Sequence, residues 1–289
     1  MDFRSELQRA KREFRESGYA EVDAELLLAH VLGITRMELH NTVIVERSFA
    51  NFENADDVLE QFEALCARRL GGEPVQYITG VAYFCDLTLQ VGRGVLIPRP
   101  ETELLVENIL LHLKFLYKKT QGRQTSVIDL GSGSGALAIA IAAQVPTAHV
   151  IAVENDPEAL VWLRKNIEGN DVDVRVVAED VSSALLGVKA DLVVANPPYI
   201  PNDQDLPFEV KNYEPHAALF GGKDGMDVPR QFIEAASRLL KDEGIFVMEH
   251  GEEQASAVEK ALEADFIDIR VHSDLNNRPR WTSAQRRPR

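Results

Sequence analysis

The sequence predicts an α/β protein in which a mostly parallel sheet, covered by helices on both faces, follows a small helical domain. From residue 101 onward, β-branched runs alternate with apolar helical patterns, as in a parallel sheet with crossover helices. Near the C-terminus two β-like stretches follow one another with no helix between them, so they must run antiparallel. Over the first 70 residues the apolar positions recur every three or four residues, which is the period of packed amphipathic helices.

The composition is that of a folded, acidic protein. Hydrophobic residues make up 45% and charged residues 27% of the 289 positions, which excludes disordered and collagen-like chains. Aspartate and glutamate outnumber lysine and arginine by 46 to 31, for a net charge of -15. Such a charge repels phosphate backbones and anionic lipid, so we expect neither a specific nucleic acid nor a membrane as partner. Cys66 and Cys85 stand far apart, and their spacing predicts no disulfide framework and no zinc site.

The first residues alternate charges with single apolar side chains and lack the apolar core of a signal peptide. The longest apolar run, Ala136 to Ala143, has less than half of the roughly 20 residues that a membrane-spanning helix needs. We therefore expect a cytoplasmic protein.

Residues 1–72 are predicted to form the helical N-terminal domain, in which acidic residues outnumber basic ones, unlike the usual DNA-binding bundle. A cap that only stabilises its neighbour and a domain that docks a substrate are equally compatible with this pattern. Residues 73–100 contain three β-rich pieces, Tyr77–Thr79, Tyr83–Phe84 and Leu87–Leu89, separated by glycine and aspartate. They predict a β-hairpin linker between the two domains.

Residues 101–289 are predicted to form the α/β domain. Helices are expected at 101–118, 136–144, 157–167, 182–186, 228–240 and 252–264, and strands at 126–129, 149–153, 174–177, 192–195, 245–249, 266–272 and 281–284. A Rossmann-like seven-stranded sheet that ends in an antiparallel hairpin resembles the class I S-adenosylmethionine-dependent methyltransferases more than the dehydrogenases.

A glycine-rich segment, Gly131-Ser132-Gly133-Ser134-Gly135, lies between the first strand and its helix. Glycine is needed where the backbone turns tightly and a ligand contacts it, because a Cβ would collide. Gly131, Gly133 and Ala136 also fit the dinucleotide fingerprint, and Glu154 ends the next strand, where ribose hydroxyls are held. NAD and S-adenosylmethionine both contain adenosine, so this loop alone does not separate them.

Three acidic positions accompany the loop. Glu154 suits ribose because a carboxylate only accepts hydrogen bonds. Asp129, at the tip of the first strand, is placed to face the amino group of a methionine moiety. Asp180 follows the third strand, where it could edge the adenine or could cap a helix that begins near Ser182, and the two interpretations carry equal weight.

The segment Asn196-Pro197-Pro198-Tyr199 follows the fourth strand at the carboxyl edge of the sheet. A planar NH2 group conjugated to a carbonyl or ring is a poor nucleophile, so geometry must activate it. The side-chain oxygen of Asn196 and the carbonyl of Pro197 can each accept one N–H, and proline holds them in place. Tyr199 would cover the substrate plane near a sulfonium, which is worth about 0.5–2 kcal/mol. Alone, the segment could be only a rigid turn.

Together with the glycine loop, this segment predicts methyl transfer from S-adenosylmethionine, with S-adenosylhomocysteine as product, because hydride transfer needs no clamp on an NH2 group. Positioning of the reactants alone can lower the activation free energy by on the order of 7–11 kcal/mol, without a strong base. Methyltransferases acting on adenine N6, cytosine N4 and glutamine N5 share the segment, so the substrate stays open at this point.

The remainder of the chain resembles one family, the HemK/PrmC glutamine N5-methyltransferases that modify peptide-chain release factors. The resemblance covers nearly the full length and includes the blocks Gly72–Gly80, Val95–Glu103, Gly131–Gly135, Asn196–Tyr199 and Glu214–Gly225. It implies that the glutamine of a Gly-Gly-Gln loop is the methyl acceptor and that the N-terminal domain helps to grip the release factor. A protomer of this design is expected to work alone, as a monomer. An adenine-N6 DNA or RNA methyltransferase and a non-catalytic cofactor-binding scaffold are the alternatives.

The resemblance also implies roles for individual residues. Asn196, Pro197 and Tyr199 would be catalytic. The substrate would be held by Asn196, Pro197, Pro198, Tyr199, Arg99 and Glu101. S-adenosylmethionine would contact Asp129, Gly131, Ser132, Gly133, Ser134, Gly135, Glu154, Asp180, Val181, Asn196 and Thr102.

Two features qualify these roles. Arg99, Glu101 and Thr102 resemble a lid, although Pro100 and the acids near it also fit a simple helix start. The sequence departs from the family's pattern at Val181, where an aromatic residue is common, and at Asn277, which replaces a turn glycine but tolerates positive φ.

Overall fold

The computed structural model describes residues 3–49 and 55–288. The chain divides into two compact units. The first extends to Val81 and includes the later segment Pro207–Tyr213, and the second contains Ala82–Leu206 and the chain from Glu214 onward.

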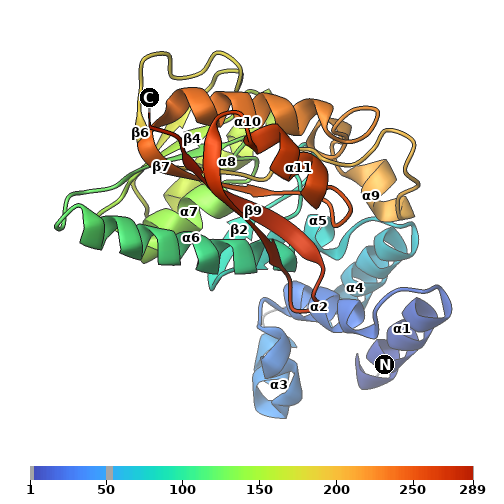
Figure 1. The fold of residues 1–289 in the computed structure, drawn as a ribbon. Coiled ribbons are helices and arrows are strands. Elements are labelled where there is room, and N and C mark those ends of the chain that lie inside the picture. The colour runs from blue at the N-terminus through green and yellow to red at the C-terminus, as the bar shows by residue number, and fades with distance from the viewer. Residues whose placement is uncertain (1–2, 50–54, 289) are drawn as a thin grey trace. The chain divides into compact units, whose positions relative to one another are not determined.

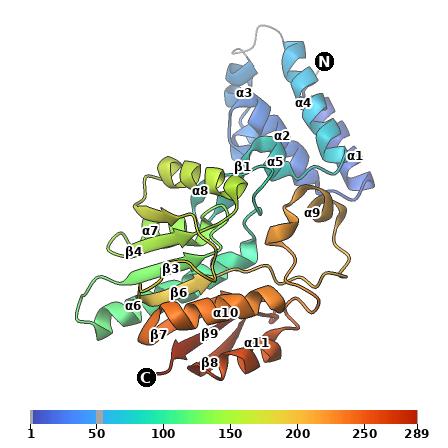
Figure 2. The same cartoon turned by 90° about the horizontal axis from the view of Figure 1, so that it is seen from above.

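The first unit is helical, as predicted. Its elements are α1 (Phe3–Glu16), α2 (Glu21–Leu32), η1 (Arg36–His40), α3 (Thr42–Phe49), α4 (Ala55–Leu70), α5 (Val75–Thr79) and α9 (Phe208–Tyr213). The apolar stripes of α1, α2 and α4 meet in a core that contains Phe14, Leu27, Leu28, Val58 and Phe62. Figure 2 shows α9, in orange, beside the blue helices of this unit although it comes much later in the sequence.

The prediction of β structure at Tyr77–Thr79 is wrong, because these residues belong to the short helix α5. Pro74 precedes the helix, Gly80 ends it at φ +73°, and Val75, Tyr77 and Ile78 are buried. Packing of this apolar face therefore outweighs the strand preference of tyrosine, isoleucine and threonine. The hairpin itself is confirmed as β1 (Val81–Phe84) and β2 (Leu87–Gln90). The functional division into docking domain, linker and catalytic domain stays a prediction.

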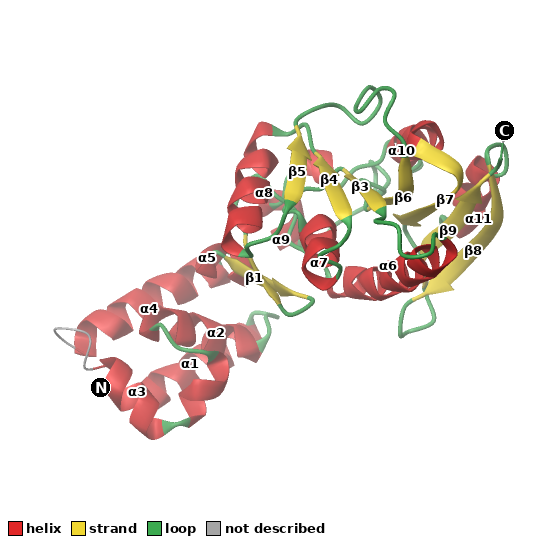
Figure 3. Cartoon of the chain, turned by 90° about the vertical axis from the view of Figure 1, so that its left-hand side faces the viewer, coloured by secondary structure: helices red, strands yellow, loops and turns green. Residues whose placement is uncertain are grey.

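The second unit contains a seven-stranded sheet with the order β5-β4-β3-β6-β7-β9-β8. The strands are β3 (Ser126–Leu130), β4 (His149–Val153), β5 (Val174–Val177), β6 (Ala190–Ala195), β7 (Leu240–Glu249), β8 (Phe266–Ser273) and β9 (Pro279–Arg286). The first five of these are parallel, whereas β9 runs antiparallel to both β7 and β8. Figure 3 shows this sequence of strands from β5 to β8. The predicted class I methyltransferase fold is confirmed.

Two helical layers cover the sheet (Figure 1). Helices α6 (Pro100–Lys119), α7 (Ala136–Gln144) and α8 (Pro157–Gly169) pack on one face, and α10 (Asp227–Leu239) and α11 (Ala255–Leu262) on the other. Successive strand residues pack against the two layers in alternation. Leu192 and Val194 face the first layer, and Val193 faces the second. The short η2 (His216–Ala218) completes the described elements of this unit.

The helix predicted at Ser182–Leu186 does not form, and this prediction is wrong. Residues 181–187 make turns, with Leu185 and Gly187 at φ +56° and +80°. Positive φ interrupts the helical hydrogen bonding after a single turn. At the C-terminal hairpin, by contrast, Asn277 adopts φ +59° and keeps the turn, as predicted.

The strand order places a crevice beside the middle of the sheet. From β3 the chain crosses to β4 on one side, and β6 later joins β3 on the other side. Connections that leave in opposite directions separate at the carboxyl ends of the strands, which is where open α/β sheets bind their ligands. The glycine segment after β3 and Asn196 after β6 therefore come together at this point.

Candidate active site

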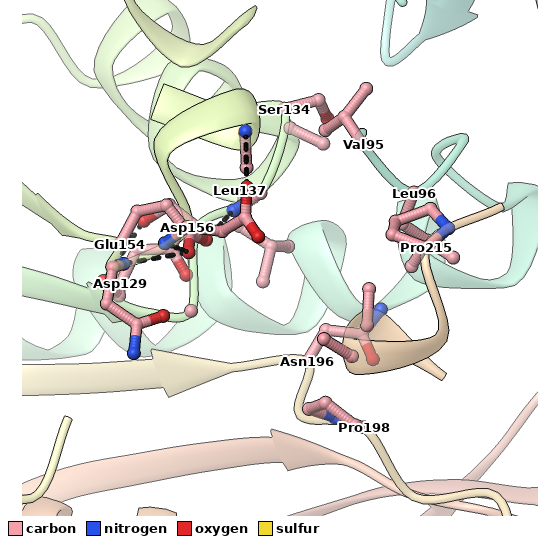
Figure 4. A pocket seen from close by; sticks show the side chains of 18 of the residues that line it. Val95, Leu96, Asp129, Ser134, Leu137, Glu154, Asp156, Asn196, Pro198 and Pro215 are labelled. Carbon is pink, nitrogen blue, oxygen red and sulfur yellow. Dashed lines mark hydrogen bonds between the residues drawn. The ribbon is translucent and has the colours of Figure 1, made fainter. Parts of the chain in front are cut away.

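A cavity of about 330 Å³ opens at the carboxyl ends of β3, β4 and β6. Figure 4 shows Glu154 and Asp156 on one side of it and Asn196, Pro198 and Pro215 on the other. The predicted site residues that line it are Arg99, Thr102, Asp129, Gly131, Ser132, Gly133, Ser134, Glu154, Asp180, Val181, Asn196 and Pro198. Residues from the two halves of the predicted site thus share one cavity.

The three glycines after β3 all have positive φ, at +66°, +55° and +87° for Gly131, Gly133 and Gly135. They serve different purposes. A Cβ on Gly135 would lie 2.7 Å from the Leu163 side chain, so this glycine permits packing inside the protein and does not line the cavity. A Cβ on Gly133 would meet no atom within 4 Å, and Gly133 lines the cavity. Gly133 therefore keeps room for a ligand against the backbone.

Glu154 is fixed by the backbone around it. Its Oε2 accepts the Gly133 N–H at 2.8 Å, and its Oε1 accepts the N–H groups of Asn155 and Asp156 at 2.8 and 2.9 Å. The residue is 8% exposed and lines the cavity. A carboxylate has about four acceptor positions, so at least one is left for a hydroxyl of a ligand.

Asp129 is buried at the floor of the cavity, with 1% of its surface exposed. Its Oδ2 accepts the Ala138 N–H at 3.2 Å, whereas Oδ1 has no hydrogen-bond partner among the described residues. Burial raises the pKa of this carboxyl to about 7. A buried acceptor without a partner is rare and is explained by a donor from a ligand, as expected for the ammonium of a methionine moiety.

The helix that Asp180 was predicted to cap does not form, and the contact of Asp180 with the adenine stays a prediction. Its Oδ1 accepts the N–H of Ser182 at 2.9 Å and the Ser182 hydroxyl at 2.5 Å, and these bonds lower the pKa of the carboxyl. It therefore organises the turn that stands in place of the predicted helix. Asp180 and the neighbouring Val181 also line the cavity.

Asn196 is half-buried at the opposite end of the cavity. Its Nδ2 donates a long hydrogen bond of 3.5 Å to the Thr102 hydroxyl. The amide oxygen on the other side of the plane is thereby left as an acceptor. This orientation agrees with the predicted use of that oxygen.

Four predicted residues are not among those that line the cavity: Pro197, Tyr199, Glu101 and Gly135. Pro197 is buried and Glu101 is exposed. The Tyr199 hydroxyl donates to Glu249 Oε1 at 3.2 Å. Burial, followed by the Glu249 carboxylate, raises the pKa of this phenol. The roles proposed for these residues stay predictions.

Arg99 lines the cavity and is held there by an acid. Its guanidinium forms an ion pair of 2.6 Å with Glu214, whose side chain is only 1% exposed. Glu214 also accepts the Ile97 N–H at 3.2 Å. The two chain segments that flank the cavity are therefore tied together through Glu214.

Several residues of the site were missed from the sequence. Lining residues without a predicted role include Val95, Leu96, Pro98, Asn155, Asp156, Pro215, Ala217, Ala218, Val228, Gln231 and Phe232. Six of them lie in the blocks Val95–Glu103 and Glu214–Gly225, which carried the resemblance but no local chemical signal. Phe232 belongs to the apolar face of α10, and its pattern does not distinguish it from a core residue.

The backbone of Asn196–Tyr199 is also supported from behind. Gln254 Nε2 donates to the Tyr199 carbonyl at 2.8 Å. A Cβ on Gly221 would lie 2.6 Å from the Pro198 carbonyl, and one on Gly225 would collide with the Tyr199 carbonyl. The repeated glycine of Gly221-Gly222 and Gly225 was a usable signal of this close approach.

The residues present fit S-adenosylmethionine. The cradle at Gly133, the partnerless oxygen of Asp129 and the fixed carboxylate of Glu154 offer a backbone approach, a site for an ammonium and an acceptor for ribose. Among the described residues no group of His, Cys, Asp and Glu could hold a metal ion. No helix in the described part of the chain is long and apolar enough to cross a membrane.

Comparison with known proteins gives consistent matches. Residues 102–211 match the family described as methyltransferase small domain, and residues 6–80 match the PrmC N-terminal domain. Similar curated proteins include release factor glutamine methyltransferases of Mycolicibacterium smegmatis and Escherichia coli. The first is 41% identical over 270 residues, which is 92% of this chain and 90% of the relative. The second is 33% identical over 286 residues, or 98% of each chain.

A solved structure of a methyltransferase from Pyrococcus furiosus is similar at a TM-score of 0.51 and 17% identity. The match covers 77% of this chain and 98% of that one. At this identity the likeness concerns the fold alone.

Proposed function

Because the chain belongs to the release factor glutamine methyltransferase family, we propose that it methylates the side-chain amide nitrogen N5 of a glutamine. The acceptor is the glutamine of the Gly-Gly-Gln motif in peptide-chain release factors. S-adenosylmethionine supplies an electrophilic methyl group on a sulfonium. A bond forms between the amide nitrogen and the methyl carbon as the bond between that carbon and sulfur breaks. The products are S-adenosylhomocysteine and the N-methylated amide, and the amide nitrogen gives up one proton to solvent.

The observation that carries the proposal is the placement of Asn196 in the same cavity as Asp129 and Glu154. A carboxamide nitrogen is a poor nucleophile because its lone pair is delocalised into the carbonyl. The Asn196 amide, with its nitrogen directed at Thr102, offers its oxygen to one N–H of the substrate. We propose that the Pro197 carbonyl accepts the other N–H.

Holding the nitrogen in this way replaces a general base by positioning. Good orientation of the reactants can lower the activation free energy by on the order of 7–11 kcal/mol. On the cofactor side, Asp129 binds the ammonium and Glu154 accepts a hydrogen bond from a ribose hydroxyl. Gly133 leaves room for the part of the cofactor between these two groups. Asp180 and Val181 border the adenine.

We propose that the N-terminal unit grips the release factor and that Arg99 and Glu101 border the substrate entrance. We also propose that the protein acts as a monomer and without a specific nucleic acid, in keeping with the net charge of -15. Methylation of adenine N6 is the alternative activity. It is disfavoured because the similar curated proteins are release factor glutamine methyltransferases.

The test is a transfer of radiolabelled methyl groups to three acceptors side by side: a release factor, its Gly-Gly-Gln variant with Gln→Ala, and duplex DNA. Label is expected only in the unaltered release factor, with the methyl group on the glutamine by mass spectrometry. Label in DNA, or equal label in the Gln→Ala variant, would overturn the substrate assignment.

A further inference from the structure

Glu249, the last residue of β7, is an acid that the proposed reaction does not use. It is 3% exposed, and it accepts two hydroxyl groups. The Thr102 hydroxyl donates to Oε2 at 2.7 Å, and the Tyr199 hydroxyl donates to Oε1 at 3.2 Å. One buried carboxylate thus connects the start of α6, the loop after β6 and the end of β7.

The Thr102 hydroxyl determines which end of the Asn196 amide faces it. A threonine hydroxyl has a single proton. When that proton is donated to Glu249, Thr102 can present only lone pairs to Asn196, whose Nδ2 lies 3.5 Å away. The Asn196 amide must then turn its NH2 group toward Thr102 and its oxygen away from it.

We propose that ionised Glu249 is a positioning residue that orients Asn196 through Thr102 and fixes the Tyr199 hydroxyl, so that the Asn196 oxygen is offered to the substrate nitrogen. This inference rests on the proposed function only in the identity of the acceptor. Glu249 touches neither the substrate nor the cofactor, and acts through its two hydroxyl partners.

Protonation of Glu249 would reverse the arrangement. A carboxylic acid donates one hydrogen bond itself, so Thr102 becomes free to donate to Asn196, and the amide can turn its oxygen toward Thr102. The acceptor for the substrate is lost in that state. Activity should therefore fall as the pH falls through the titration of Glu249.

Several charged and hydroxyl groups affect the titration of Glu249. Burial raises the pKa of its carboxyl, and Glu101 near the start of α6 adds to this effect. Thr102, Tyr199 and Arg280 of β9 oppose it. Arg99 acts on the same network through Tyr199, whose phenol it stabilises in the charged form. The net direction is upward, so the titration should occur above the usual range of a glutamate.

The first experiment measures kcat and KM against pH for the wild type, Glu249→Gln and Glu252→Gln. Glu252 is an exposed neighbour that serves as a charge-matched control. Glutamine keeps the size of Glu249 but cannot accept both hydroxyl groups and does not titrate. We expect kcat of Glu249→Gln to fall about 10- to 100-fold, as for a lost hydrogen bond to a charged group. With S-adenosylmethionine kept saturating at every pH, the acid limb of its kcat profile should vanish and the KM for the release factor should change little. Glu252→Gln should keep the limb.

A second pair of variants tests the path through Thr102. Thr102→Ser retains the hydroxyl and Thr102→Val does not. The serine variant should exceed the valine variant in kcat by about tenfold, and combining Thr102→Val with Glu249→Gln should cost little more than either change alone. Additive losses in kcat would contradict a shared path.

A third measurement does not depend on the substrate. The NMR signals of the Asn196 side-chain NH2 are identified as the pair missing in Asn196→Ala, and are followed against pH in the protein without substrate. They should shift with pH in the wild type and stay constant in Glu249→Gln. An unchanged titration in Glu249→Gln, or no titration in the wild type, would overturn the inference. If the wild type fails to methylate a release factor while these signals respond to Glu249, the proposed substrate is wrong and the positioning role stands.

Discussion

At the residue scale, Asp129 links cofactor binding to a proton. Its carboxyl is buried, one oxygen lacks a partner among the described residues, and its pKa is raised by burial to about 7. An ammonium binds the ionised carboxylate, so below pH 7 the protein must first release a proton. The dissociation constant for S-adenosylmethionine should therefore increase about tenfold per pH unit below that value and level off above it.

Calorimetric titration between about pH 6 and 8, about one unit on either side of the pKa of about 7, measures this dependence. Asp129→Asn should bind weakly with little dependence on pH. Asp180→Asn is the matched control, because the pKa of Asp180 is lowered and its carboxyl stays ionised throughout this range. If Asp129→Asn retains the steep dependence of the wild type, the assignment of the ammonium to Asp129 is wrong.

At the scale of elements, Asp191 joins the start of β6 to its neighbours. It accepts from the Ser126 N–H and hydroxyl of β3, from Arg123 and from Lys241 of β7. Burial alone would raise the pKa of this carboxyl, but these partners outweigh burial and lower the pKa to about 2. Because the folded pKa is depressed, the stabilisation is complete above about pH 4, the unfolded value, and is lost as pH falls toward 2.

Asp191→Asn should therefore lower the free energy of unfolding near pH 7 by about 2 kcal/mol, and the difference from the wild type should shrink on acidification. Urea denaturation at several pH values measures it. Glu243→Gln, which removes an exposed ion pair with Lys119, should cost under about 1 kcal/mol and serves as control. A deficit for Asp191→Asn that is constant down to about pH 2 would contradict this explanation.

In the helical unit, Arg69 holds α4 to α2 and to α9. Its guanidinium pairs with Asp23 at 2.7 Å and Glu209 at 2.6 Å, and lies 4.1 Å above the Tyr19 ring. Side chains of Arg69 and Asp23 are 7% and 9% exposed. Removing one partner would leave the other charge buried without compensation.

We expect Arg69→Met to destabilise this unit by about 3–5 kcal/mol in chemical denaturation. The neighbouring Arg68 provides the matched control, since its pair with Glu73 leaves the arginine 45% exposed. Arg68→Met should cost about 1 kcal/mol or less. Equal losses in the two variants would show that burial of the Arg69 pair is not the cause.

At the scale of the whole molecule, the order of strands and helices could be predicted from the sequence. The spacing of apolar residues that identifies a strand or a helix lies within that element. The parallel sheet, its terminal hairpin and the helical first unit were all predicted from patterns within about 20 residues. Short elements were less predictable. The six residues of α9 span less than two helical turns, which is too short to show a repeated pattern. Helix α5 consists of residues with strand preference that pack as a helix.

In the candidate site, too, residues with a local sequence pattern were predicted and residues that depend on distant contacts were not. The glycine loop, Glu154 and Asn196 were recognised because each follows a strand, and strand ends converge in this fold. Glu249 also ends a strand, but its partners Thr102 and Tyr199 lie 147 and 50 residues away in the sequence. The role of a buried acid depends on those distant donors, so no local pattern indicated it. Phe232 and Gln231 were missed for a similar reason, because only the packing of α10 brings them to the cavity.

Asn196→Ala tests most directly whether the Asn196 oxygen holds the substrate nitrogen. Methyl transfer to the release factor is measured at saturating substrate, and cofactor affinity is measured on the same preparation. Turnover is expected to fall at least about 10²- to 10³-fold while the dissociation constant of S-adenosylmethionine changes less than about threefold. Near-normal turnover, or a parallel loss of cofactor affinity, would contradict the account.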